Sequence, residues 1–154
     1  HVFDAKFLGN HIMSYFIRCA ATTLLLSLSY QVVASDWEVV SGGSGTYALV
    51  DKESIRFNGN TAKIWVKWVY DEPQEVAYSY PKKYYQLVKS LELYKCVDRT
   101  SATIQSIQYA QPDGSDVVGS FQYKEAQAQF SEIAPDTMGE TILQWVCKRK
   151  PRQR

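Results

Sequence analysis

Apolar and polar side chains alternate along much of the chain after residue 36, with the period of two that indicates β-strands. The clearest run is 61–70, which predicts a strand with one fully buried face. Asn58 and Gly59 stand just before it, and an Asn-Gly pair favours a hairpin because both residues tolerate positive φ. We therefore expect the short segment 54–57 to pair with this strand. The apolar positions of the run are Ala62, Ile64, Val66, Trp68 and Tyr70.

Further segments with strand patterns are separated by residues that favour turns. A glycine-rich stretch at 42–45 separates two of them, and Pro112, Asp113 and Gly114 provide turn geometry between two others. Strands that follow one another through short turns favour an antiparallel sheet, here of about six strands. These segments are 37–40, 46–51, 90–97, 101–110 and 116–123.

One helix is predicted near the end of the chain. Thr137 and Glu140 have the spacing of a capping box, in which each side chain accepts from a free backbone N–H of the first turn. Pro135 stands just before the cap, where a missing N–H does no harm. The apolar side of the helix is broad enough to pack on a sheet: Met138, Ile142, Leu143, Trp145 and Val146. The fold class is therefore α+β, a single antiparallel sheet with one C-terminal helix packed on it.

The segment 13–35 has the layout of a secretory signal peptide. Arg18 precedes an apolar stretch, and the small residues Val32 and Ala34 precede the expected cut. A membrane anchor or a buried helix would be the alternative, but a bilayer span needs about 20 predominantly apolar residues, and this run is shorter and interrupted by polar side chains. We therefore expect cleavage, with no transmembrane segment remaining. The expected parts are an upstream extension at 1–12 that is not native, a signal peptide at 13–35, one domain at 36–147 and a basic tail at 148–154.

The charge of the expected mature chain narrows the classes of partner. Lys6, Arg18 and Asp4 precede the domain, which leaves 15 basic and 15 acidic side chains and no net charge. A nucleic-acid-binding domain is usually strongly basic, so nucleic acid is not an expected partner. The basic tail has two interpretations. It attaches to an anionic lipid or polysaccharide surface, or Lys148 and Arg149 complement the negative end of the helix.

The side chains of the mature chain offer little for catalysis or metal binding. His1 and His11 both precede the signal peptide, so no histidine remains, and we expect no catalytic residue, metal site or cofactor. Glycosidases can work with a pair of carboxylates, and Asp71, Glu72 and Glu75 do cluster. Their surroundings, which include a proline, indicate an exposed loop, so we expect a protein that is not an enzyme.

Cys96 and Cys147 are the cysteines of the expected mature chain. An exported protein meets an oxidising environment, where two cysteines most often form a disulfide. A thiol nucleophile usually needs a nearby base such as histidine, and a structural zinc site needs four ligands. We therefore expect a disulfide that pins the helix to the strand carrying Cys96, with a free buried pair as the alternative.

Two stretches are candidates for a binding surface. In the first, Lys63, Trp65 and Lys67 face away from the buried side of their strand, and aromatic residues are enriched at protein interfaces. Two interpretations are open. Either the helix or a second subunit covers Trp65 while the lysine stems lie along it, or the surface binds a partner.

The second stretch is 78–89, in which tyrosines surround lysines. Tyrosine provides a large contact area with a polar tip, and lysine attracts acidic partners over a distance. The stretch suits an acidic protein segment, a sulfated glycan or single-stranded nucleic acid, of which the last fits an exported protein least. An ordinary tyrosine-rich strand or loop is the alternative. The candidate residues here are Tyr80, Lys82, Lys83, Tyr84 and Tyr85.

Several of these features occur in an order that resembles the surface-adhesin protein E family of bacterial envelope proteins. The resemblance rests on the segments 47–68 and 89–96, on the hairpin 107–121 and on the end of the domain at 133–147. It implies export, an antiparallel sheet with an attached helix, paired cysteines, dimers, and adhesion to host matrix or serum proteins. The matching residues serve turns, caps and a bridge, so they specify a fold better than an activity.

Two functions of different class remain open at this stage. The first is an exported, non-enzymatic adhesion or protein-binding module that binds a partner such as a host extracellular-matrix protein. The second is a periplasmic structural, regulatory or inhibitor-type binding protein with no adhesive role. Both place the protein outside the inner membrane of a Gram-negative bacterium, in the periplasm or at the outer surface.

Overall fold

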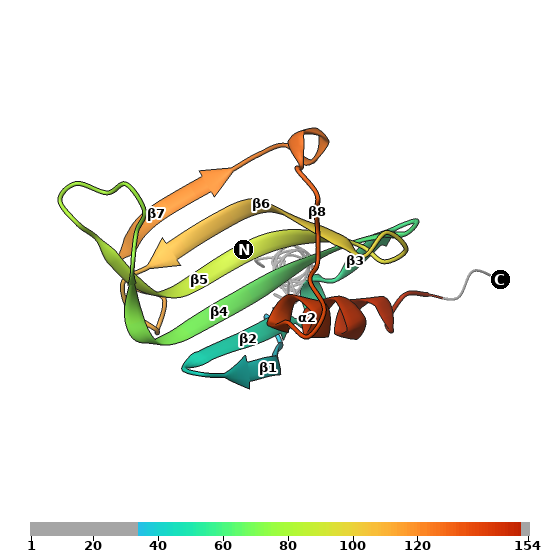
Figure 1. Ribbon diagram of the computed structural model, residues 1–154, viewed down its shortest axis with the longest axis horizontal. Helices are drawn as coiled ribbons and strands as arrows, with labels where there is room; N and C mark the ends of the chain where they lie inside the picture. Colours follow the sequence, from blue (N-terminus) through green and yellow to red (C-terminus); the bar gives the residue numbers. More distant parts are fainter. Residues whose placement is uncertain (1–33, 152–154) are drawn as a thin grey trace, which may run out of the picture. The chain divides into compact units, whose positions relative to one another are not determined.

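A computed structural model describes residues 34–151 of the chain. The predicted signal peptide therefore lies almost wholly outside the described residues, as does the end of the basic tail. Within 34–151, eight strands form one antiparallel sheet, whose main path runs β1-β2-β4-β5-β6-β7 (Figure 1). The strands are β1 (Trp37–Gly43), β2 (Thr46–Asp51), β3 (Arg56–Asn58), β4 (Thr61–Glu75), β5 (Tyr84–Lys95), β6 (Thr100–Tyr109), β7 (Val117–Gln122) and β8 (Ser131–Glu132).

Each of the two shortest strands, β3 and β8, pairs along a strand edge that it shares with another strand. β2 pairs with the middle of β4, and β3 pairs with its start, with the 3₁₀ turn η2 (Lys52–Ser54) between them. In the same way β7 and β8 share one edge of β6. The hairpin of β3 and β4 turns at Gly59, whose φ of 58° is the positive value expected of the Asn-Gly pair. The predicted pairing of the segment before Asn58 with the long strand is thus confirmed.

β4 is longer than the sequence pattern predicts, because it continues past Tyr70 to Glu75. The pairing of β4 with β2 reaches only to Tyr70. Beyond that point β4 pairs with β5 alone, through an irregular stretch between Val69 and Gln74. Pro73 lacks an N–H to donate, and it is tolerated here because β4 has become an edge strand. The acidic stretch expected to be a loop is therefore part of a two-stranded arm formed by β4 and β5.

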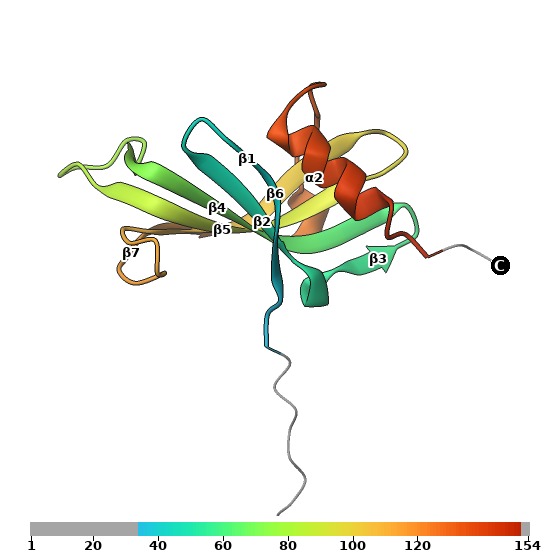
Figure 2. The ribbon, with the colours of Figure 1, turned by 90° about the horizontal axis from the view of Figure 1, so that it is seen from below.

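The core lies between one face of the sheet and the helix α2 (Met138–Cys147), as Figure 2 shows from the side. The even positions of β4 face the helix, in agreement with the predicted period of two. Ile142, Leu143 and Val146 fill the space above them and are at most 2% exposed. The sheet residues of this cluster are Ala48, Val50, Ala62, Ile64, Val66 and Tyr94. The α+β class and the packing of the helix on the sheet are as predicted.

A buried carboxylate lies on the same face of the sheet. Glu92 is 6% exposed, and its oxygens accept hydrogen bonds from Trp68 Nε1 at 3.3 Å, from Ser90 Oγ at 2.7 Å and from the Tyr94 hydroxyl. A buried polar group is costly unless such hydrogen-bond partners compensate for the lost water. Burial is the main reason that the pKa of Tyr94 is raised well above its usual value. Tyr94 therefore stays a neutral donor to Glu92.

The predicted cap begins the helix. The backbone N–H of Glu140 donates to Thr137 Oγ1 at 3.2 Å, and Glu140 Oε2 accepts from the N–H of Asp136 at 2.8 Å. That backbone donor, together with the Arg99 side chain, lowers the pKa of Glu140. These contacts stabilise the ionised carboxylate of Glu140. Their contribution to the stability of the fold is therefore present at neutral pH and is lost as the pH falls through the folded-state pKa of Glu140.

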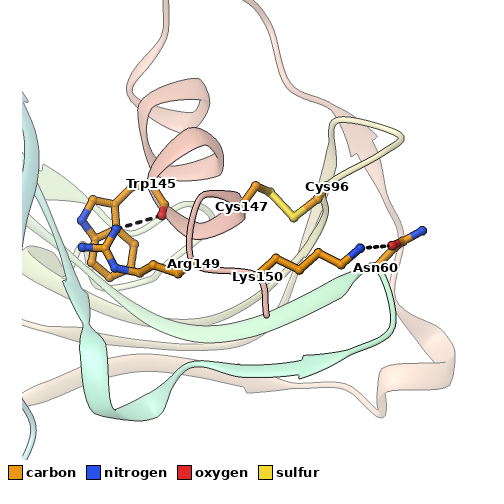
Figure 3. The surroundings of a disulfide bond; sticks show 6 residues. All are labelled: Asn60, Cys96, Trp145, Cys147, Arg149 and Lys150. Atoms are coloured by element: carbon orange, nitrogen blue, oxygen red, sulfur yellow. Dashed lines mark hydrogen bonds between the residues drawn. A yellow bond between two sulfur atoms is a disulfide. The ribbon is translucent and has the colours of Figure 1, made fainter. Parts of the chain in front are cut away.

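A disulfide between Cys96 and Cys147 joins the end of the helix to the turn that follows β5 (Figure 3). The predicted bridge is thus confirmed, and it closes a loop between positions 51 residues apart. Just beyond it, the Arg149 guanidinium lies 3.3 Å from the centre of the Trp145 ring and donates to the Trp145 carbonyl at 3.0 Å. Lys150 donates to the side chain of Asn60.

A second attachment joins the helix to the first strand. Trp145 Nε1 donates to Glu38 Oε1 at 2.9 Å, and Arg149 lies 3.8 Å from the other oxygen of the same carboxylate. The helix is therefore held by its apolar face, by the disulfide and by this polar contact with β1. Among the described residues no helix is long and apolar enough to cross a membrane.

We predict that replacing both cysteines, as in Cys96→Ser with Cys147→Ser, lowers the free energy of unfolding by about 2–4 kcal/mol. The loss arises because the unfolded chain regains the freedom that the closed loop removes. Urea denaturation followed by tryptophan fluorescence measures it. Dithiothreitol should bring the wild type to the stability of the double variant and leave that variant unchanged. Equal midpoints for both proteins without reductant would contradict a stabilising role.

The helix cap gives a second prediction. Thr137→Ala should lower the free energy of unfolding by about 1 kcal/mol, because the N–H of Glu140 loses its acceptor. Thr141→Ala is the matched control, since Thr141 is exposed on the same helix one turn later and should change stability by less than about 0.5 kcal/mol. Thermal unfolding of the two variants compares them, and equal losses would show that Thr137 does not cap the helix.

Candidate binding surface

The loop 76–83 joins the two strands of the arm and projects past the ends of β1 and β7 (Figures 1 and 2). Tyr78 and Tyr80 have relative exposures of 106% and 100%, so neither ring is shielded by the rest of the domain. Exposed rings of this size are uncommon without a partner, because tyrosine usually buries much of its surface. We call this surface the tyrosine tip and define it by Tyr78, Tyr80, Lys82, Lys83 and Tyr84.

Hydrogen bonds within the loop hold the tyrosine tip in shape. The Val76 N–H donates to the Lys83 carbonyl at 2.8 Å, which closes the base of the loop. Ser79 Oγ donates to the Val76 carbonyl at 2.8 Å and accepts from the Lys83 N–H at 3.0 Å. Tyr78 has a φ of 58°, which turns the chain sharply beside it. A loop ordered in this way loses less conformational entropy when it binds.

The lysines of the tip are exposed and differ in their partners. Lys82 Nζ lies 2.9 Å from Glu75 Oε2, and this hydrogen bond is the main cause of the raised pKa of Lys82. Lys83 forms no ion pair within the described part of the chain. At the base of the arm, Tyr85 packs edge to face on Tyr70 with ring centres 5.6 Å apart. Tyr85 therefore stiffens the arm and is only half-buried, whereas Tyr84 is 47% exposed.

The first predicted stretch lies on the face of β4 that points away from α2. Trp65 is half-buried there, and since the helix packs on the opposite face, the helix is not what shields it. Lys63 pairs with Glu125 of the 3₁₀ turn η3 (Glu125–Gln127). Lys67 Nζ lies 4.2 Å from the centre of the Trp37 ring, and burial, followed by the charge of Lys89, lowers its pKa.

The structure brings the two predicted stretches together only where Lys67 lies opposite Lys89, and it keeps the rest of the first stretch far from the tyrosine tip. Lys63 lies near the start of β4 and Glu75 at its end, and twelve residues of strand span about 40 Å. Lys67 pairs across the sheet with Lys89, far from the loop. Seven of the eight predicted residues therefore lie on two surfaces, the face of β4 that points away from α2 and the projecting tip. The eighth, Tyr85, lies at the base of the arm.

The carboxylates considered from the sequence lie on the arm, and a further one lies in the core. No cluster of histidine, cysteine and carboxylate side chains that could hold a metal ion occurs between residues 34 and 151. Asp71, Glu72 and Glu75 are exposed along the arm, where Glu75 pairs with Lys82. The carboxylate of Glu92, by contrast, lies in the core with hydrogen bonds to both oxygens.

A hollow beside β7 was not predicted from the sequence. Phe121 and Tyr123 line it together with side chains from β6 and from the connection that follows β7. The sequence did place both aromatic residues on a strand, and their spacing of two puts them on the same side of it. Whether other side chains cover these two rings depends on the path of the connection 124–130. The sequence pattern contains no signal for that path.

Comparison with known proteins gives a consistent result. The profile of the family described as surface-adhesin protein E matches residues 37–148, which is most of the chain. Among solved structures, protein E of Haemophilus influenzae is 18% identical, with a TM-score of 0.52 over 76% of this chain and 89% of that one. Its crystal form II gives a TM-score of 0.53 at 18% identity, covering 75% and 90%. At this identity the structures show a shared fold. No curated protein matches the chain.

Proposed function

The chain belongs to the surface-adhesin protein E family, and from that premise we propose that it is an exported, non-enzymatic adhesion module that binds a protein partner through the tyrosine tip. The partner we propose is a host extracellular-matrix or serum protein. The observation that carries the proposal is the full exposure of Tyr78 and Tyr80 at the end of the two-stranded arm. Tyrosines are enriched among the residues that contribute most to binding at protein interfaces.

The surroundings of the two rings support this role. Lys82 and Lys83 are exposed beside them, so an acidic patch on a partner would be attracted before contact. The loop is closed by its own hydrogen bonds, and its ordering therefore costs little on binding. The arm also carries the tip away from the core, so the core residues can serve the fold while the tip contacts a large partner.

The same proposal requires the tip to lie outside the cell. An adhesin must present its binding surface beyond the outer membrane, whereas the second function considered from the sequence would confine it to the periplasm. The family supports a surface or exported protein. We propose the outer surface, because two uncovered tyrosines on a projecting arm are of most use where a large partner has free access.

We predict that Tyr78→Ser with Tyr80→Ser weakens binding about tenfold or more, since the rings would supply much of the buried contact area. Surface plasmon resonance with the protein flowed over a panel of immobilised matrix and serum proteins measures this. Lys82→Ala with Lys83→Ala should mainly slow association and reduce the loss of affinity as NaCl is raised.

Matched control variants distinguish a specific effect of the tip residues from the effect of removing any exposed tyrosine or lysine. Tyr47→Ser removes a tyrosine that is 44% exposed on β2, and Lys124→Ala with Lys148→Ala removes two exposed positive charges elsewhere. Both controls should bind like the wild type. If the tip variants also retained wild-type affinity for every partner that the protein binds, the tyrosine tip would not be the binding site.

Protease treatment of intact cells that express the full chain tests the location. We expect trypsin to release peptides that end at Lys82 or Lys83 without disruption of the outer membrane, because both lysines are exposed in the loop. Mass spectrometry identifies the peptides, and a known periplasmic protein in the same cells must stay intact. Release that occurs only after permeabilisation would place the protein in the periplasm and favour the non-adhesive function.

A further inference from the structure

The hollow beside β7 has the composition of a ligand site. Phe121 and Tyr123 are 43% and 55% exposed, and their ring centres lie 5.3 Å apart at an interplanar angle of 41°. The rings therefore contact each other and still offer open faces to the hollow. Its volume is about 340 Å³, within the range of small-molecule sites. The other lining residues are Thr103, Gln127 and Gln129.

All the polar groups that line the hollow are neutral. Two hydroxyls and two amides provide both donors and acceptors, and none of the five lining side chains is charged at neutral pH. Gln127 Oε1 accepts from the Lys124 N–H at 3.2 Å, which orients the amide and leaves its NH₂ group as a donor. Glu125, the nearest acidic residue in sequence, pairs with Lys63 instead.

Three backbone hydrogen bonds hold the walls of the hollow in place. The N–H of Tyr123 donates to the Ile104 carbonyl at 2.7 Å, which continues the pairing of β7 with β6 beyond the end of the strand. The N–H groups of Gln127 and Ala128 donate to the carbonyls of Lys124 and Glu125 at 2.8 and 3.1 Å, which forms the turn η3. The hollow thus exists before any ligand binds, which lowers the entropic cost of binding.

From this geometry we propose that the hollow beside β7 binds a neutral saccharide, with a sugar ring against Tyr123 or Phe121 and its hydroxyls hydrogen-bonded to Thr103, Gln127 and Gln129. One face of a pyranose ring presents C–H groups, whose partial positive charge suits the negative face of an aromatic ring. The remaining groups of a neutral sugar are hydroxyls and amides, which both donate and accept, as the lining residues do.

The composition favours a sugar over a peptide. A peptide that added a strand at the edge of β7 would use main-chain groups along the whole strand, whereas the hollow is formed by side chains from β6, β7 and the connection after it. A sulfated or sialylated glycan would require a cation in the lining. The site is separate from the tyrosine tip, and the proposal does not depend on adhesion through that tip.

Saturation-transfer-difference NMR on the disulfide-intact protein tests the proposal, with maltose, lactose, N,N′-diacetylchitobiose and mannobiose as probes. We expect transfer to the C–H protons of at least one disaccharide, with affinity unchanged as NaCl is raised. Tyr123→Ala should lower that affinity about tenfold, and Gln129→Ala should lower it severalfold. Tyr78→Ala, at the tyrosine tip, should have no effect. Circular dichroism checks that each variant is folded.

The outcomes are distinct. Binding that is lost in Tyr123→Ala and Gln129→Ala and kept in Tyr78→Ala supports the proposal, even if the tip binds no protein. Binding that survives both hollow variants overturns it, as does the absence of transfer from all four disaccharides. A preference for sialylated or sulfated probes that declines with salt would also overturn it, because the lining carries no charge to explain such a preference.

Discussion

Among residues 34–151, one α-helix of ten residues provides the second layer for a sheet whose main path is six strands wide. Domains are built from packed layers, and a sheet face left without a partner stays open to water. α2 covers the part of the sheet where β2, β4 and β5 meet, and the fully buried side chains gather there. The helix is also held by a disulfide and by the contact of Trp145 with Glu38.

The limited cover of α2 also leaves the two proposed binding surfaces open. The tyrosine tip and the hollow beside β7 both lie away from α2, and each is carried by paired strands that keep it in place. Binding residues in proteins are often found on loops held by a rigid scaffold. Here the scaffold depends on Ile64, Val66 and their neighbours. The binding surfaces depend on aromatic side chains that the core does not use.

Local signals in the sequence were sufficient for most of the fold. Alternation along β4, the Asn-Gly turn and the Thr137 cap each act over a few residues, and the structure has all three. The other half of the expected capping box differs, because Glu140 accepts from the N–H of Asp136 and not from that of Thr137. The extension of β4 past Tyr70 was not predictable, because it depends on pairing with β5, and Pro73 argues against a strand. Glu92 is a similar case. Its burial depends on donors from three other residues, which no periodicity reveals.

The candidate site was predicted in part for the same reason. The composition of the stretch around Lys82 and Lys83 indicated a surface, but its position at the end of an arm follows from the length of β4 and β5. Likewise, alternation placed Phe121 and Tyr123 on one side of a strand, whereas the hollow beside them requires the path of the connection 124–130. Which side chains share a surface is decided by pairings between segments that lie far apart in the sequence.

The position of α2 at the end of the domain also imposes an order in time. Its partners β2 and β4 are made or released long before Cys147, so neither can bury its apolar face when it first appears. A ribosome or a translocation pore that releases the chain from its N-terminus therefore holds the domain open until the last helix has emerged. The domain therefore stays unfolded until nearly all of it has been released, and packing of the core and closure of the disulfide are the last steps of its folding.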